Sequence, residues 1–402
     1  MFFVVVGTLL LIGVWWWRRM DRRLCHQGFG LGWRLVLAGY CISMVVFPWL
    51  ATREGNFLPA AITTPGYLWH VLVLPAVIVL TAAGDLVWVG VQTGRRHKIA
   101  KTQAGAERRP EILGGANNAN SLSRRRFLTG AVAIAPPLVT GGLTGVSLAE
   151  LGDFRVRSLD VAVHGLPAGL DGFAIAMVAD VHTGPFSTQR MLDNIVTATN
   201  TIHNGGPADL VVLAGDLINT TLHDMPQALD MVRQLRGRLG LYAILGNHDC
   251  MDNVEVFSEM MEESGIPLLR DQVATIEATP NVRIQLLGVA WQMGGDEPLY
   301  QSVAATAAKR DPDLFPICLV HHPHGWDEAV RQGLPLTLAG HTHGGQIMLN
   351  DRIGLGPLKF RYWNGVHQRE NSTLVICNGV GNWFPLRFNA PAEILRVILK
   401  KM

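Results

Sequence analysis

The pattern of hydrophobic and polar positions changes near residue 150 and divides the chain into two parts. Four long apolar stretches precede that point, at about residues 2–17, 31–50, 67–91 and 127–149. Because a helix needs roughly 20 mostly apolar residues to cross a bilayer, the pattern predicts an all-α region of three to four transmembrane helices. The second and third stretches fit best. The first is short and the fourth contains Pro136 and Pro137, so a buried core helix is the alternative for those two.

Basic residues predict how these helices are oriented. They cluster after the first stretch and again between the third and fourth, whereas the segment between the second and third holds one arginine. Since cytoplasmic loops carry an excess of lysine and arginine, we expect a multi-pass protein of the bacterial plasma membrane with its N-terminus outside. The expected layout is three spans in 1–93, a basic cytoplasmic linker in 94–126, a fourth span or signal anchor in 127–149, and an extracytoplasmic catalytic domain in 150–402. If the fourth stretch does not cross, the catalytic domain stays inside.

The start of the fourth stretch is similar to a twin-arginine export signal. Residues 123–128 read Ser-Arg-Arg-Arg-Phe-Leu, a modest apolar region follows, and Ser147 and Ala149 offer small residues for cleavage. Arginines that merely flank a span are an equally good interpretation, because such a signal normally stands at the very N-terminus. Under the first interpretation the twin-arginine export machinery is a partner. Under both, the catalytic domain lies outside.

Composition narrows the range of partners. The 402 residues are 49% hydrophobic and only 16% charged, with a net charge of +2. The second half has no basic stripe with interleaved aromatic residues, so we predict no nucleic-acid partner. The five cysteines show no CxxC spacing, which argues against a disulfide framework or a thiolate zinc site.

From about residue 152, short apolar runs alternate with helical patterns. Continuous apolar runs of strand length are typical of buried strands in a covered sheet, and they occur at 173–178, 210–213, 242–245, 317–320 and 336–338. Helical patterns lie between them, at 188–201, 226–235, 254–263 and 300–309. The repetition of strand, loop and helix predicts an α/β fold. About 250 residues suffice for one sizeable core.

Metal-ligating side chains follow each of these predicted strands. In chain order they are Asp180 and His182, Asp216, Asn247 with His248 and Asp249, His321 with His322, and His341 with His343. Ligands bind outside the carboxyl ends of strands in such sheets, so we expect five strand ends to deliver these side chains to one rim. Imidazole, carboxylate and amide oxygen suit Mn, Fe or Zn better than Ca. Two such cations about 3.5–4 Å apart are a known device for hydrolysing phosphate esters.

The ordered motifs resemble the calcineurin-like metallophosphoesterase family. The set Asp-x-His, Gly-Asp, Gly-Asn-His-Asp, His and Gly-His-Thr-His covers residues 180–343. Its extension to Gly-His-Thr-His-Gly-Gly-Gln, together with residues 379–391, is similar to the branch of YkuE- and YaeI-type bacterial phosphodiesterases. Some relatives of that broad group cleave UDP-diacylglucosamine. The resemblance implies a four-layer α/β/β/α sandwich of two mixed sheets, and it does not cover residues 1–150.

The resemblance also implies a role for each motif residue. One metal would be bound by Asp180, His182, Asp216 and His343, and the other by Asp216, Asn247, His321 and His341, with Asp216 bridging. A hydroxide between the metals would attack phosphorus in line. His248 would protonate the leaving oxygen, and Asp249 would orient His248. His321 is preferred to His322 because the family pattern is His-x-Pro, and Arg387 is a candidate for binding a substrate phosphate, with a structural arginine as the alternative.

These observations predict a metal-dependent phosphoesterase anchored in the membrane. Phosphodiester or pyrophosphate bonds are the expected targets, and a lipid or envelope-linked substrate fits an enzyme held near its bilayer. A phosphomonoesterase or protein phosphatase would use the same centre and is the first alternative. A membrane receptor with this fold and no turnover is the second. His248 argues against the receptor, because a binding module has no need for a leaving-group acid.

Overall fold

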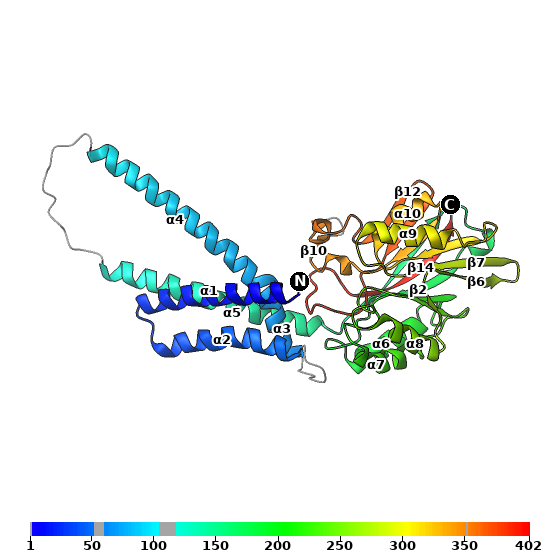
Figure 1. Ribbon diagram of the computed structural model, residues 1–402, viewed down its shortest axis with the longest axis horizontal. Helices are drawn as coiled ribbons and strands as arrows, with labels where there is room; N and C mark the ends of the chain where they lie inside the picture. Colours follow the sequence, from blue (N-terminus) through cyan, green and yellow to red (C-terminus); the bar gives the residue numbers. More distant parts are fainter. Residues whose placement is uncertain (1, 52–59, 104–117, 351–352) are drawn as a thin grey trace. The chain divides into compact units, whose positions relative to one another are not determined.

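The computed structural model describes residues 2–51, 60–103, 118–350 and 353–402, and it forms two compact units, Met1–Leu148 and Ala149–Met402. The first unit is entirely helical (Figure 1). Its elements are α1 (Phe2–His26), α2 (Leu31–Ala51), α3 (Ala60–Leu68), a π-helical turn η1 (Trp69–Val73), α4 (Leu74–Gln103) and α5 (Asn118–Glu150), which runs on into the second unit. Residues 104–117 of the expected basic linker lie outside the described residues.

Two helical segments of the described chain are long and apolar enough to cross a membrane. They are Ala60–Thr93 and Arg124–Glu150, which contain the third and fourth predicted stretches. Leu31–Phe47, in the second stretch, is a shorter apolar helix, and the first stretch is not among the candidates in the described residues. The fourth stretch is continuous through Pro136 and Pro137. Length and composition therefore support two spans directly, fewer than the three to four expected.

Aromatic side chains and one hydrogen bond join the helices of this unit. The Trp69 ring meets the rings of Trp16 and Tyr40 edge-on, with centroids 5.3 and 5.2 Å apart. The Tyr40 hydroxyl donates to Thr140 Oγ1 over 2.9 Å. These contacts connect α1, α2, η1 and α5. The hydrogen bond also gives the Tyr40 hydroxyl a partner that its apolar surroundings would not supply.

The second unit contains two six-stranded mixed sheets. The first has the order β1-β14-β2-β3-β4-β5, formed by Arg155–Val163, Glu393–Lys401, Ala174–Val178, Leu210–Ala214, Leu241–Ile244 and Leu268–Leu269. The second has the order β12-β13-β9-β8-β7-β6, formed by Gly365–Arg369, Ser372–Ile376, Leu336–Ala339, Phe315–Leu319, Val282–Gly288 and Gln272–Thr279. A separate hairpin pairs β10 (Met348–Asn350) with β11 (Ile353–Gly354). The predicted mixed α/β fold is confirmed.

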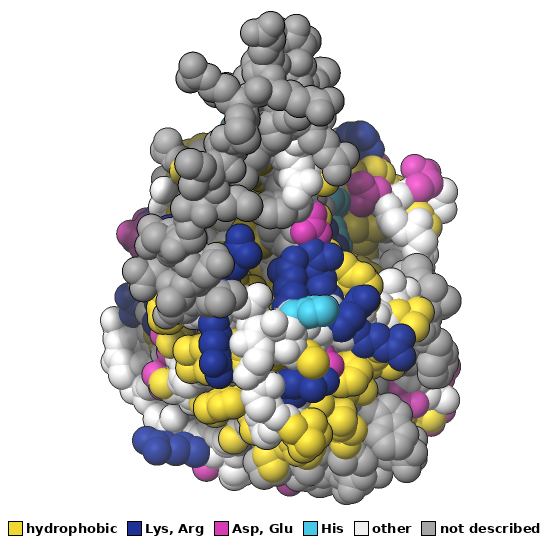
Figure 2. Space-filling model, turned by 90° about the vertical axis from the view of Figure 1, so that its left-hand side faces the viewer, with side chains coloured by type: hydrophobic (Ala, Val, Ile, Leu, Met, Phe, Trp, Pro, Cys, Tyr) yellow, Lys and Arg dark blue, Asp and Glu magenta, His cyan; other side chains and the backbone are white. Residues whose placement is uncertain are grey.

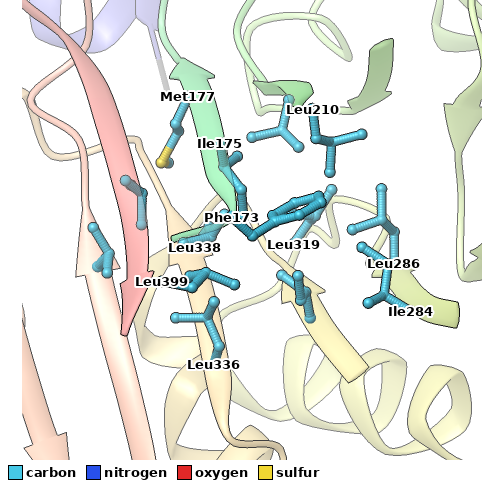
Figure 3. Close-up of a cluster of buried hydrophobic side chains, with 14 of the residues drawn as sticks. Phe173, Ile175, Met177, Leu210, Ile284, Leu286, Leu319, Leu336, Leu338 and Leu399 are labelled. Atoms are coloured by element: carbon cyan, nitrogen blue, oxygen red, sulfur yellow. The ribbon is translucent and has the colours of Figure 1, made fainter. Parts of the chain in front are cut away.

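The main hydrophobic core draws side chains from both sheets. Ile175 and Leu210 of the first sheet share one buried cluster with Leu286, Leu319 and Leu338 of the second (Figure 3). Continuous apolar strands of this kind are expected where both faces of a sheet are covered. The core therefore sets the distance between the two sheets, and with it the distance between the loops that leave them.

Helices cover the remaining faces of the sheets. The first sheet shares a second cluster with α6 (Gln189–Asn200), α7 (Met225–Val232) and α8 (Val254–Glu263). The second sheet shares a third cluster with α9 (Asp296–Ala307) and α10 (Trp326–Arg331). The four helical patterns read from the sequence correspond to α6, α7, α8 and α9.

Candidate metal centre

The predicted ligands stand in loops that leave the carboxyl ends of parallel strands in both sheets. In the first sheet, Asp180 and His182 follow β2, Asp216 follows β3, and Asn247 follows β4. In the second sheet, His321 follows β8, and His341 and His343 follow β9. The expectation of one rim was wrong in this respect: two rims, one from each sheet, meet at the site. Apolar runs alone do not show which strands share a sheet.

Asp216 lies at the middle of the resulting cluster and is buried. Its Oδ2 is 3.2 Å from Nε2 of His321 and 3.6 Å from Nε2 of His182. Asp180 Oδ1 lies 3.5 Å from Nε2 of His343, and the Nε2 atoms of His182 and His343 are 3.0 Å apart. Carboxylate oxygens and imidazole nitrogens from four loops therefore converge on one small volume.

Three groups in the described chain have ligand atoms within 4.8 Å of one another. They are Asp180 with His182 and His343, His182 with Asp216 and His248, and Asp216 with His321 and His341. The first and third groups consist of members of the two ligand sets expected from the resemblance. The role of each residue as a metal ligand stays a prediction.

Asn247 supplies an independent test of whether the site fits a cation. Its side-chain oxygen is buried and has no hydrogen-bond partner among the described residues. A buried acceptor without a partner is costly, about 1–3 kcal/mol, and such an atom in a native structure calls for an ion or water. An amide oxygen beside carboxylates and imidazoles suits a divalent cation. The donor set therefore fits a metal.

The ligand loops have unusual backbone conformations. Asp180, His182, Asp216, His341 and His343 all have positive φ, between 47° and 73°. Non-glycine residues rarely adopt this region, and such strain is concentrated at functional sites. Asp180, Asp216 and His341 stand two residues after the last residue of β2, β3 and β9, so the backbone changes direction close to each strand end and sends these side chains toward the shared volume.

Close backbone approach explains one glycine of the motifs. A Cβ on Gly246 would lie 2.1 Å from Oδ1 of Asp216, so no larger residue fits without moving that carboxylate. The same carboxylate accepts a hydrogen bond of 2.8 Å from the backbone N–H of His248. The Gly-Asn-His-Asp segment thus packs directly on Asp216.

Asp216 and His321 form a charged pair in the absence of metal. Burial alone would raise the pKa of the Asp216 carboxyl, but the charge of His321 and its hydrogen bond hold that pKa well below the usual range. Burial would lower the pKa of His321, yet Asp216 outweighs burial and raises the pKa to about 9. His321 Nδ1 lies 2.7 Å from the carbonyl oxygen of Ala214 and donates to it. Its Nε2 is therefore the atom that faces Asp216.

Burial is the largest influence on the pKa values of four other predicted ligands. It raises the pKa of the Asp180 carboxyl to about 7 and lowers that of the His182 imidazole to about 3. It also holds the pKa values of His341 and His343 well below their usual range. Neutral imidazole is the form that binds metals, so three of the four histidines are already in it near neutral pH.

His248 and Asp249 have different partners from those expected. Asp249 was expected to orient His248, but its carboxylate accepts backbone N–H groups of Asp216, Leu217, Ile218 and Gly246 at 2.8–3.1 Å. His248 Nδ1 instead donates to the carbonyl oxygen of Asn219. Asp249 therefore shapes the loop that carries Asp216, while Asn219 orients the His248 ring, which lies 4.5 Å from the His182 ring.

Arg387 is buried, and its guanidinium is directed at protein atoms. It donates to Asn382 Oδ1, to three backbone carbonyl oxygens, and over 2.7 Å to His343 Nδ1. Burial lowers its pKa to about 10. These contacts favour the alternative interpretation, in which Arg387 is a structural residue. Its side chain holds the 378–390 loop against His343.

Aromatic side chains beside the cluster were not anticipated. The Trp291 and Phe360 rings lie 5.6 and 5.5 Å from the His341 ring, and the half-exposed Trp383 lies 6.3 Å from His248. Their spacing in the sequence carries no periodic signal. Trp383 falls within residues 379–391, the segment already noted for its similarity to the family branch, and that was the one available clue.

Comparisons with known proteins agree with this geometry. The model of the calcineurin-like phosphoesterase family matches residues 173–345. The chain is 30% identical over 293 residues to the uncharacterized metallophosphoesterase YkuE of Bacillus subtilis, covering 69% of this chain and 98% of YkuE. It is 25% identical over 417 residues to a Danio rerio protein described as a transmembrane protein with metallophosphoesterase domain, covering 100% of this chain and 89% of that protein. It is 27% identical over 283 residues to phosphodiesterase YaeI of Escherichia coli, covering 68% of this chain and 97% of YaeI.

Fold and site together define a metal-dependent hydrolase of phosphate esters. The chain belongs to the calcineurin-like phosphoesterase family. Proteins of this family typically bind two divalent metals, and the His and Asp groups described above could hold such ions.

Proposed function

We propose that this chain is a membrane-anchored phosphoesterase that uses two divalent ions, Mn, Fe or Zn, to hydrolyse phosphodiester or pyrophosphate bonds. The observation that carries the proposal is the buried Asp216 carboxylate between the imidazoles of His321 and His182, at 3.2 and 3.6 Å. Buried charge is tolerated where it is paired or coordinates a metal. The name of its relative YaeI favours a diester.

The proposal keeps the ligand sets expected from the motifs. They are Asp180, His182, Asp216 and His343 for one ion, and Asp216, Asn247, His321 and His341 for the other. When bound, divalent ions supply charge to phosphoryl oxygens and lower the pKa of water toward 7 from about 15.7. The protein holds the ligands in place through the two sheets and the loop anchored by Asp249.

His248 is the proposed leaving-group acid. Because its Nδ1–H donates to the carbonyl of Asn219, its Nε2 is the nitrogen free to carry and release a proton. General acid–base help of this kind contributes about 10²–10⁴-fold to a rate. His248 lies beside the ligand His182, within reach of a substrate bound at the cluster.

The proposed location is the bacterial plasma membrane, with several passes and the catalytic unit outside. Support comes from the two apolar helices and from the transmembrane description of the Danio rerio relative. Arg126, near the start of the second apolar helix, donates to the carbonyl of Gly28 after α1, so two basic segments meet at one end of the helical unit. Lys and Arg side chains gather around a histidine on the face in Figure 2. Basic residues at one end favour that end as the cytoplasmic one.

Anchoring favours a substrate that belongs to the membrane or the envelope. Export through the twin-arginine machinery stays a prediction. The proposal also includes the order helices, sheet, sheet, helices for the catalytic unit. Three hydrophobic clusters, one shared by the sheets and one between each sheet and its helices, support this order.

The test compares variants of the full chain in detergent with Mn²⁺ and bis-p-nitrophenyl phosphate. Asp216→Asn should lose both bound metal and turnover. His248→Gln should keep its metal and lose about 10²–10⁴-fold in kcat, while the exposed His164→Gln should match the unchanged protein. Equal turnover by the Asp216→Asn variant and the unchanged protein would refute the mechanism. Faster hydrolysis of p-nitrophenyl phosphate than of the diester would assign a monoesterase instead.

A further inference from the structure

Several large apolar side chains are exposed on one part of the catalytic unit. We call this part the hairpin surface, and it consists of Leu349, Ile353, Leu355, Leu358, Trp383 and Phe388. Leu358 is 84% exposed and Trp383 is 42% exposed. Isolated exposed apolar residues are ordinary, but a contiguous group of them marks an interaction site.

Backbone hydrogen bonds join the segments of the hairpin surface. Strands β10 and β11 form a hairpin, and the N–H of Met348 in β10 donates to the carbonyl oxygen of Phe388 over 2.8 Å. The N–H of Leu358 donates to the carbonyl of Leu355 over 3.1 Å. The described segments 348–350, 353–358 and 383–388 therefore form one continuous piece of surface.

The inner side of the hairpin is packed, so its outer side is held in place. Met348, Trp363 and Ala390 form a small buried cluster beneath it. A Cβ on Gly356 would lie 2.3 Å from the Trp363 ring, which shows that the backbone lies directly against the indole. A hairpin with one face on the core normally presents polar side chains on the other. Here Leu349 and Ile353 are exposed instead.

The hairpin surface adjoins the metal centre. The short 3₁₀-helical turn η5 (His343–Gly345) contains the predicted ligand His343, and strand β10 begins three residues after this turn ends. With the Gln346 amide oriented to satisfy both its neighbours, its oxygen accepts from Trp383 Nε1 over 3.2 Å. The Trp383 ring lies 6.3 Å from His248. A molecule that rests on the hairpin surface could thus extend a polar group to the catalytic residues.

A cation borders this surface. Lys359 follows Leu358, and its ammonium lies 5.1 Å from the centre of the Phe360 ring. Among the described residues it forms no ion pair with a carboxylate. A lysine and a tryptophan at the margin of an apolar surface are typical of contact with a membrane interface, where the ammonium meets anionic headgroups.

We propose that the hairpin surface docks on a lipid bilayer, so that the metal centre acts on a phosphoester at the membrane surface. This inference rests on the proposed membrane anchorage, because the apolar helices of the same chain would hold the catalytic unit near that bilayer. It narrows the substrate class to phosphoesters whose apolar part stays in the membrane. A second copy of the chain would cover the same apolar side chains, but it has no need of the lysine and the half-exposed tryptophan at the margin.

The first experiment maps lipid contacts in the unchanged full chain. The protein is placed in vesicles of phosphatidylethanolamine and phosphatidylglycerol that contain a phosphatidylcholine with a diazirine at the end of an acyl chain. After illumination, mass spectrometry should find cross-links at the residues of the hairpin surface as well as in the apolar helices Ala60–Thr93 and Arg124–Glu150. Cross-links in the helices alone would overturn the proposal, as would equal labelling of α8, which carries the exposed Val256.

The second experiment separates docking from catalysis. A Leu349→Glu/Leu358→Glu protein should lose about tenfold in cross-link yield at the hairpin, because a charge replaces each of two exposed apolar side chains that would contact lipid. Its turnover of soluble bis-p-nitrophenyl phosphate should stay unchanged. This second readout distinguishes a failure of the docking proposal from a failure of the proposed phosphoesterase activity. The matched control is Val256→Glu/Val366→Glu, which changes exposed apolar residues elsewhere and should keep full labelling. Loss of soluble turnover, or a change from dimer to monomer by light scattering, would overturn docking.

Discussion

The protonation state of His321 should control metal binding. Without metal, Asp216 raises the pKa of His321 to about 9 despite burial. Its Nδ1–H is engaged by the Ala214 carbonyl, so the proton that titrates is the one on Nε2, the atom facing Asp216. A protonated nitrogen cannot bind a metal. The affinity for the ion that His321 ligates should therefore rise as pH rises toward 9 and fall as pH is lowered, with a proton released when that ion binds.

The size of the effect follows from the pKa. With a pKa of about 9, roughly 99% of His321 is protonated at pH 7, which weakens the apparent affinity about 100-fold. At pH 9 the corresponding loss is about twofold, so the affinity should increase about 50-fold between pH 7 and pH 9. Asp180, with a pKa of about 7, adds at most about a further factor of two over this range.

Titration calorimetry with Mn²⁺ measures this directly. The full chain in detergent would be titrated at pH 7, 8 and 9 in buffers of different ionisation enthalpy, which report the number of protons released. His322→Gln is the matched control, because burial lowers the pKa of His322 to about 3 and it has no proton to lose in this range. It should show the same slope as the unchanged protein. Equal affinities at pH 7 and pH 9, with no proton release, would refute the assignment of His321 as a ligand.

Three further predictions concern stability and metal content. Asp249→Ala leaves four buried N–H groups without an acceptor and should lower the free energy of unfolding by about 3–5 kcal/mol in urea denaturation; an effect below about 1 kcal/mol would contradict this. Gly246→Ala should displace the Asp216 carboxylate and lower bound metal measured by mass spectrometry of metals, whereas Gly152→Ala, whose Cβ meets nothing within 4 Å, should not. Chelation should lower the Tm of the catalytic unit, because free metal at 100 times its Kd stabilises by about 2.7 kcal/mol per site; an unchanged Tm would show that the cluster binds no ion.

Local signals in the sequence were sufficient for the strands that carry the site. The run predicted at 210–213 became β3, and the one at 336–338 became β9, each within one residue of its predicted ends. Helix α8 begins and ends as predicted, because Asn253 accepts N–H bonds from Glu255 and Val256 and fixes its start. Apolar runs, caps and turn residues are local, and a single sequence records them.

Pairing between distant strands was not predictable in this way. Strand β14 lies between β1 and β2, so residues near 395 pair with residues near 157 and 177. Nothing local in Glu393–Lys401 shows that partner. The same limit applies to side-chain partners: the interaction of Asp249 with backbone amides, in place of His248, depends on how the Asp216 loop turns. Contacts of this kind arise from the assembled sheets. The family resemblance supplied the layered architecture and the roles of the motif residues, but not these partners.

The strained loops show what holds the centre together. Positive φ at a non-glycine residue costs about 1–3 kcal/mol, and Asp180, Asp216 and His341 each adopt it two residues after the end of a buried strand. The strands cannot shift to relieve the strain, because their apolar side chains share one core between the sheets. That core therefore offsets the local cost and holds the ligand atoms of each of the three groups within 4.8 Å of one another. It follows that the position of the ligands depends mainly on the packing between the sheets.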